Sequence, residues 1–377
     1  MRVLVLLSPA KTLNWAIPPA SLSAVWSQPK LLKEADAVIE VMRGKKKADL
    51  KKLMSVSDSI ADLNVERFKN FLPSSKVAEG PPAAEMAADY ARPAALAYDG
   101  PAYRGMDAAT FSEEDWIFGA GSVRLLSGLY GVLRPSDLIQ PYRLEMGSRV
   151  GVDGKKDLYD YWKEDIARCL LQDVRGKDCK GGGAGRFLVV NVASQEYSKA
   201  VDFGQLESAG GMVVTCVFKD DGRVLSVFAK RARGLFARHI VISRAKDIAD
   251  LESFSAEGYC LDRSQSSDGL LVFARSKAQR LGPTKSPAGA KSPASVQAKS
   301  EAKPKAESKG KTRKKIQDKK KTNRTTSTTG RVENQITPAS RTGKKSAVGA
   351  SSAATARGKR ASPAGSEGGS KAKVKRT

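Results

Sequence analysis

The stretch LLSGLYGVLRPSDLIQPYRLEMGSR, residues 125–149, is the part of the chain from which its organisation is most easily worked out. It opens with an apolar run, and Gly128 and Gly131 then bracket two large residues, Leu129 and Tyr130. Glycine lets the backbone turn sharply and approach a partner closely. Four arginines surround the turn: Arg124, Arg134, Arg143 and Arg149. This pattern indicates a surface that binds phosphates. Our first hypothesis is that these are the phosphates of a nucleic acid.

The flanks of the turn predict helices. Ser112 followed by Asp115 matches a capping box, which predicts a helix from there to about Ser127. Pro135 ends regular structure, and Ser136 or Asp137 can cap a second short helix. A helix, a Gly-x-x-Gly turn and a second helix form a helix-hairpin-helix, whose backbone N–H groups make an anion site. The Gly-x-x-Gly pattern alone is a weak signal.

Composition divides the chain of 377 residues into a folded domain, residues 1–280, and a tail, residues 281–377. The tail has 25 lysines and arginines against 5 acidic residues, a net charge of +20 out of the +25 of the whole chain. It contains no aromatic residue, and so it lacks the apolar surface that would offset its ordering entropy. We therefore predict a disordered, basic, Lys/Ala/Ser/Pro-rich tail.

The first 280 residues predict alternating strands and helices, which indicates an α+β or mixed α/β fold. Residues 3–7 are a continuous apolar run, typical of a strand buried on both faces, and Lys11 follows just past its end. Ligands tend to bind at that edge of a sheet, although Lys11 also fits an ordinary solvated loop. The other expected strands and helices are residues 29–43, 49–71 (with a break near 62–64), 156–171, 187–194, 229–243 and 270–276. Asp-Gly at 221–222 predicts a hairpin between residues 212–218 and 224–230.

The helix expected at residues 229–243 carries a basic edge. Arg231 and Arg238 are seven residues apart and share a face, with Lys230 and Arg233 flanking them. Apolar residues alternate with these cations, so we expect the helix to lie on the sheet with its basic edge exposed.

The sequence offers little catalytic or metal-binding chemistry. His239 is the single histidine, which excludes multi-histidine metal sites, and the four cysteines lack zinc spacing. We predict no cofactor, no metal and no membrane span, since no apolar run approaches about 20 residues. An enzyme acting on nucleic acid or a nucleotide-like substrate remains the alternative, with Lys11 as nucleophile or phosphate clamp and Glu145 or Glu257 as its acid/base partner.

The tail has two interpretations. Its composition is similar to the tails of linker histones and bacterial histone-like proteins, which bind DNA by neutralising phosphates with little sequence preference. The alternative is a solvated linker that improves solubility.

Taken together, seven motifs resemble the YaaA peroxide-stress protein family, in order from about residue 3 to residue 276. They include LLSPAKTLNW, RLLSGLYGVLRPSDLIQPYRLEMG, NVASQEYSKAV and FAKRARGLFARHIV. The resemblance implies a single compact domain of the cantaloupe fold, with a helix-hairpin-helix element and a positive cleft that binds double-stranded DNA. It also implies a cytoplasmic role in oxidative stress that limits iron-linked damage. The basic tail is outside the family pattern and leaves a nucleoid-associated or nuclear location open.

Carried over by motif, the resemblance gives a set of expected DNA-cleft residues. They are Lys11, Arg124, Gly128, Gly131, Arg134, Arg143, Lys230, Arg231, Arg233 and Arg238.

Overall fold

The structure is a computed structural model that describes residues 1–16, 25–77, 91–175 and 186–280. These residues belong to one compact unit within residues 1–293. The expected tail, residues 281–377, lies outside the described residues, as does nearly all of the glycine-rich segment at 176–186.

A seven-stranded sheet forms the centre of this unit, in the order β10-β11-β9-β8-β1-β5-β6. Its strands are β1 (Arg2–Leu7), β5 (Val123–Ser127), β6 (Gly131–Leu133), β8 (Phe187–Asn191), β9 (Gly211–Asp220), β10 (Cys260–Leu261) and β11 (Leu270–Arg275). The five inner strands are mutually parallel, and the two edge strands, β6 and β10, are antiparallel to their neighbours. The apolar run of β1 is buried from Val3 to Leu7 because the strand is sandwiched within a covered sheet.

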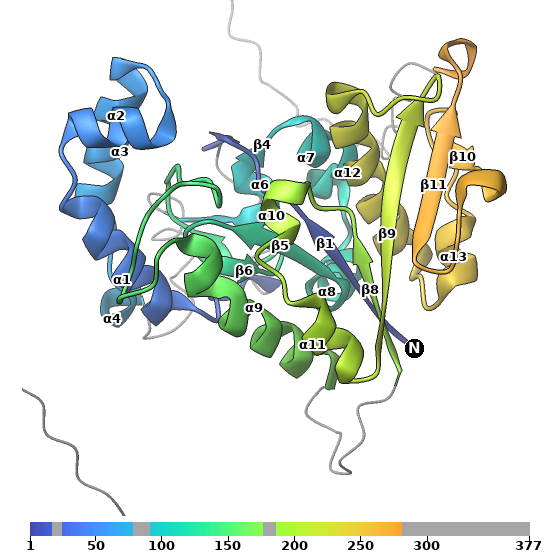
Figure 1. Cartoon of the computed structure of the whole chain (residues 1–377), viewed down its shortest axis with the longest axis horizontal. Helices are drawn as coiled ribbons and strands as arrows, with labels where there is room; N and C mark the ends of the chain where they lie inside the picture. Colours follow the sequence, from blue (N-terminus) through green and yellow to red (C-terminus); the bar gives the residue numbers. More distant parts are fainter. Residues whose placement is uncertain (17–24, 78–90, 176–185, 281–377) are drawn as a thin grey trace, which may run out of the picture. The chain divides into compact units, whose positions relative to one another are not determined.

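Helices cover both faces of the sheet (Figure 1). The longest are α1 (Leu32–Arg43), α3 (Asp58–Asn70), α8 (Glu113–Ser122), α9 (Leu158–Arg175) and α12 (Ser226–Ser243). Helices α9 and α11 (Phe203–Ser208) lie against one face, and α8 and α12 lie against the other. Trp116 of α8 and Trp162 of α9 are fully buried on these two faces. This arrangement is a mixed α/β fold, as the sequence predicts.

Short elements complete the unit. They are α2 (Lys47–Met54), α4 (Ser74–Val77), α6 (Ala94–Ala97), α7 (Pro101–Met106), α10 (Gln195–Ser198), α13 (Ile248–Glu252), β2 (Thr12–Leu13), β3 (Arg92–Pro93), β4 (Tyr98–Asp99) and β7 (Leu138–Ile139). Strand β2 pairs with β4, and β3 pairs with β7, so that two small ribbons flank the main sheet.

The helix expected to run from Ser112 to Ser127 is wrong in its second half. Helix α8 begins with the expected capping box at Ser112 but ends at Ser122, and residues 123–127 form strand β5. The chain turns at Gly128 and returns as β6, so the predicted helix-hairpin-helix at this place is a β-hairpin. A short apolar run fits a buried strand as well as a buried helix, and here pairing with β1 decides for the strand.

The hairpin predicted around Asp221-Gly222 is also wrong. The turn itself forms, with positive φ at both residues, but the chain then enters α12 at Ser226. Strand β9 already pairs on one side with β8 and on the other with β11, both parallel. Strand β11 occupies the place beside residues 215–220, and the antiparallel pairing after the turn is limited to the single bridge between Asp220 and Arg223.

The helical stretch expected at residues 49–71 is broken, but earlier than predicted. Helix α2 ends at Met54, Ser55 takes a left-handed conformation, and the Ser57 hydroxyl accepts a hydrogen bond from Ile60 N–H to cap α3. Asn64, at the predicted break, lies inside α3 and donates its side-chain amide to the Ile60 carbonyl.

Candidate nucleic-acid interface

A cavity of about 370 Å³ lies at the carboxyl edge of the sheet, at the ends of β1 and β8. From β1 the chain reaches its next main-sheet strand, β5, on one side; from β8 it reaches β9 on the other. Ligands bind at such points in open α/β sheets because the diverging connections leave a crevice. We call this cavity the edge pocket; the side chains that define it are Ser8, Lys11, Tyr103, Ser194, Lys230 and Arg233.

Hydrogen bonds fix the floor of the edge pocket. The Ser8 hydroxyl accepts from the Ser194 N–H at 2.8 Å and donates to the Ser194 hydroxyl at 3.2 Å. The Tyr103 hydroxyl donates to the Ser8 carbonyl at 3.0 Å. The loops after β1 and β8 and helix α7 are therefore tied together.

Two cations of α12 enter the pocket without a partner among the described residues. Lys230 is exposed, and Arg233 is half-buried with its Nε atom enclosed and unbonded. Burial lowers the pKa of Arg233. A desolvated guanidinium that lacks an acceptor is a favourable place for an anion.

A second group of cations lies beside the pocket, around Glu145. The Lys11 ammonium is 2.8 Å from Glu145 Oε2, and Arg143 Nη2 is 3.1 Å from Oε1. The Arg143 Nε atom is buried and has no hydrogen-bond partner in the described part of the chain. Arg67 of α3 has a pKa lowered by burial and also by the charge of Arg143, which places these two guanidinium groups close together. The structure thus joins Lys11 and Arg143, two of the predicted residues, through one carboxylate.

Arg231 and Arg238, expected in the cleft, are held by their own chain. Arg231 Nη2 is 2.6 Å from the buried carboxylate of Glu257. Arg238 donates to the carbonyls of Met106 and Asp107, both at 3.1 Å, and lies over the ring of Phe111. Both side chains fasten α12 to its surroundings.

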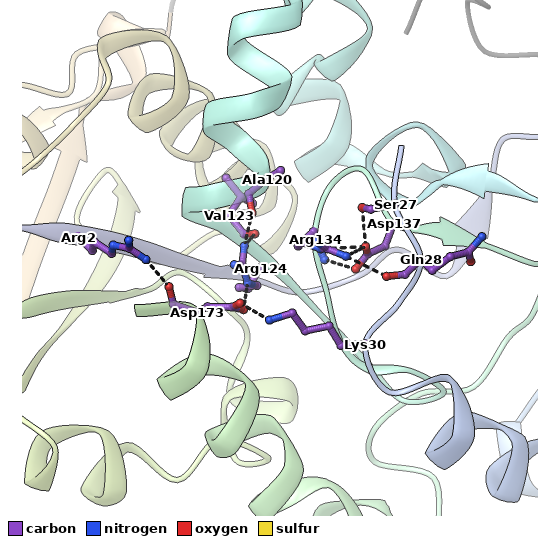
Figure 2. A network of polar contacts seen from close by, with 10 residues as sticks. All are labelled: Arg2, Ser27, Gln28, Lys30, Ala120, Val123, Arg124, Arg134, Asp137 and Asp173. Carbon is purple, nitrogen blue, oxygen red and sulfur yellow. Dashed lines mark hydrogen bonds and ion pairs between the residues drawn. The ribbon is translucent and has the colours of Figure 1, made fainter. Parts of the chain in front are cut away.

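Arg124 and Arg134 line a different cavity, of about 600 Å³, near the amino ends of β1 and β5. Figure 2 shows both arginines with the groups that they bind. Arg124 is only 4% exposed and binds Asp173 through Nε at 2.8 Å, together with two backbone carbonyls. Burial raises the pKa of Asp173, but the charges and hydrogen bonds of Arg124 and Lys30 together outweigh burial and leave the pKa below its usual range. Arg134 binds the buried Asp137 and the Gln28 carbonyl. The structure does not bring these two arginines to the edge pocket.

Gly128 and Gly131 are buried in the β-hairpin. A Cβ atom on Gly128 would lie 2.5 Å from the Leu144 carbonyl oxygen, and Gly131 has φ +65° with Trp162 at 2.7 Å from its added Cβ. The Trp162 indole N–H donates to the Gly128 carbonyl at 3.0 Å. Close packing against Trp162 and the chain at Leu144 explains both glycines within the described structure.

Helices α2 and α3, the two parts of the helical stretch expected at residues 49–71, pack on each other as a two-helix unit and are joined by residues 55–57. Lys47 and Lys51 pair with Asp62 and Asp58, each at 2.7 Å. Lys46 and Lys52 are also exposed. Ser57 directly before an acidic first turn is the N-cap signal that could have placed this unit.

The two carboxylates suggested as acid/base partners of Lys11 in an enzyme, Glu145 and Glu257, lie in different surroundings. Glu145 contacts Lys11, whereas Glu257 is buried against Arg231. Among the residues that the structure describes, no three metal-ligating side chains gather. None of its described helices is both long and apolar enough to cross a bilayer.

These features define a mixed α/β protein with a cation-lined pocket at the point where its sheet connections diverge. Residues 3–265 match the family model described as Peroxide stress protein YaaA, and the chain belongs to this family. A UPF0246 protein of Aromatoleum aromaticum is 39% identical over 277 residues, which cover 71% of this chain and 97% of the relative. A UPF0246 protein of Shewanella baltica is 38% identical over 279 residues, or 73% of this chain and 100% of the relative. One of Dinoroseobacter shibae is 40% identical over 277 residues, covering 72% and 95%.

Proposed function

We propose that this protein binds duplex DNA along the carboxyl edge of its sheet, as part of the peroxide stress response. The proposal rests on two buried Nε atoms that have no acceptor among the described residues. One belongs to Arg233, which lines the edge pocket, and the other to Arg143, which shares Glu145 with the pocket residue Lys11. Buried N–H groups are nearly always paired, so such atoms call for an acceptor. Phosphate oxygens supply acceptors and neutralise the charge together.

The cations form a path that suits a phosphate backbone. Arg67 lies near Arg143, Arg143 shares Glu145 with Lys11, and Lys11 lines the same pocket as Lys230. The path leads from the α2–α3 unit to α12, and the exposed Lys46 and Lys52 extend its positive charge. Contacts of this kind fix position on a duplex without reading its sequence.

The proposal places the protein on cytoplasmic DNA, the nucleoid included, where it helps to limit iron-linked oxidative damage. The tail adds a net charge of +20, which would strengthen attraction to DNA without adding sequence preference. In this view the edge pocket and the cations beside it determine where DNA lies, and the tail determines how tightly it is bound.

The variant Lys230→Ala is expected to weaken binding of the full-length protein to all duplex sequences alike. Each phosphate contact contributes about 0.9 to the slope of log K against log salt, so the slope should become shallower by about that amount. Fluorescence anisotropy with a labelled duplex over a series of salt concentrations measures this slope.

Lys246→Ala is the matched control. Lys246 is exposed and lies three residues beyond the end of α12 at Ser243, and the helix from Lys230 to that end is about 20 Å long at 1.5 Å per residue. Its slope should equal that of the unaltered protein. If both variants keep the full slope, the sheet edge does not bind DNA and the tail is the only binder.

A further inference from the structure

The charges that line the edge pocket leave room for one bound anion. Four cations and two carboxylates line it: Lys11, Arg104, Lys230, Arg233, Asp99 and Glu196. Lys11 is neutralised by Glu145, and Arg104 by Asp99 at 3.0 Å. Lys230 and Arg233 remain without a carboxylate partner in the described structure, and Glu196 remains without a cation, so the lining keeps two free cations and one free carboxylate. The two cations, three residues apart on α12, suit a terminal phosphate, which carries nearly two negative charges at neutral pH.

The remaining walls suit a ring with hydrogen-bond donors. Leu7, Pro9, Pro101 and Tyr197 contribute apolar or flat surface to the pocket. The Glu196 carboxylate accepts one hydrogen bond, from Gly147 N–H at 3.2 Å, through Oε1. A carboxylate has about four acceptor positions, so it retains the capacity to accept an N–H or O–H of a ligand.

Size limits the occupant to a single unit. A volume of about 370 Å³ is at the small end of ligand pockets, which run from about 300 to 1,000 Å³. A double helix cannot enter such a space, whereas one base with its sugar and phosphate can. An unstacked base in DNA is bound in this way when it leaves the duplex.

We propose that the edge pocket binds one nucleotide, with its phosphate on Lys230 and Arg233 and its base against the apolar wall near Glu196. Two sources share this chemistry: a free nucleoside monophosphate and an unpaired nucleotide within a DNA strand. The second source rests on the DNA binding proposed above, and the first does not.

The first measurement is calorimetric titration of the full-length protein with dAMP, dGMP, dCMP and TMP, each beside its phosphate-free nucleoside. At least one monophosphate is expected to bind, and its nucleoside about tenfold more weakly or worse, because a charge-assisted hydrogen bond is lost. Arg233→Gln should lower the monophosphate affinity about tenfold, and the exposed substitution Lys230→Ala should lower it in the same direction. Lys246→Ala should leave it unchanged.

The second measurement compares a fully paired duplex with the same duplex carrying one unpaired nucleotide. A preference for the unpaired nucleotide that disappears in Arg233→Gln identifies the source as DNA. Monophosphate binding without such a preference identifies the free nucleotide, and the pocket assignment stands. If the unaltered protein binds no monophosphate and shows no preference, the pocket assignment is overturned, even if paired duplex still binds. Loss of all duplex binding with monophosphate binding intact would instead overturn the DNA proposal alone.

Discussion

Gly234→Ala is expected to lower the free energy of unfolding by about 3 kcal/mol or more. A Cβ atom on Gly234 would overlap the Ala102 carbonyl oxygen and lie 2.9 Å from Met106 N. Both are backbone atoms of α7, so no side chain can rotate away. Gly105 of α7 packs equally closely on α12: a Cβ atom added to Gly105 would lie 3.0 Å from Leu235 N. Urea denaturation followed by circular dichroism measures the loss.

Gly121→Ala provides the control for this substitution. Gly121 is an exposed residue of α8, and no atom of the described residues lies within 4 Å of its added Cβ. Alanine is favoured over glycine inside a helix by up to about 1 kcal/mol, so this variant should be equally stable or slightly more stable. Equal stability of Gly234→Ala and the unaltered protein would show that α7 and α12 do not cross as closely as the structure has them.

Arg275→Met is expected to lower the free energy of unfolding by about 3–5 kcal/mol at neutral pH. Asp220 is fully buried, and Arg275, whose side chain is 4% exposed, meets it at 2.8 Å. Arg275 also donates to the Glu257 carbonyl at 2.7 Å, while Tyr259 donates to Asp220. Removing the guanidinium leaves a buried carboxylate whose remaining cation, Arg280, is 3.1 Å away.

The loss should shrink as the pH falls. In the unaltered protein burial raises the pKa of Asp220, but hydrogen bonds from Tyr259 and Arg275 outweigh burial and leave the pKa below its usual range. The resulting stability is present above the unfolded pKa of about 3.9 and is lost as the pH falls through the folded pKa. Without Arg275, two of the effects that lower the pKa of Asp220 are lost, so we expect this pKa to rise. Protonation of Asp220 at low pH would then remove the unfavourable buried charge and reduce the destabilisation. The urea midpoints of Arg275→Met and the unaltered protein should therefore differ most at pH 7 and approach each other at pH 5 and pH 4.

Arg263→Met separates this effect from loss of any arginine–carboxylate pair. Arg263 binds Glu252 at 2.8 Å, but its side chain is 76% exposed. Exposed pairs contribute about 0–1 kcal/mol, so this variant should change little at any of the three pH values. A deficit in Arg275→Met that stays constant with pH would contradict the role assigned to Asp220.

Much of the fold follows from sequence patterns, and the errors share a physical cause. Strands β1 and β11 and helix α12 lie close to their predicted places because long apolar or amphipathic runs identify them. The sequence predicts helix at residues 123–127, since a five-residue segment with three apolar residues, VRLLS, does not distinguish helix from strand. Its state depends on pairing with β1, more than a hundred residues away in the chain. The missing strand after Asp221-Gly222 likewise depends on β11, which occupies the place beside β9.

The candidate site was predictable by residue type but not by environment. The sequence marks Arg124 and Arg233 alike as arginines next to apolar residues. Only the tertiary structure supplies Asp173 to Arg124 and leaves the Nε atom of Arg233 without an acceptor. Which cations are already neutralised is decided by residues distant in sequence, and a motif does not contain that information.

Glu145 acts as an internal counter-ion for Lys11 and Arg143. A phosphate that arrives at these two cations displaces a carboxylate of the protein, as well as ions condensed on the DNA. The exchange of one anion for another yields less net ion release than a contact made by Lys230, which has no such carboxylate among the described residues. In a salt titration, the contact made by Lys230 should therefore contribute its full share to the slope of log K against log salt. The contacts made by Lys11 and Arg143 should contribute less. Replacing Glu145 by glutamine would turn both into ordinary phosphate contacts and steepen the dependence on salt.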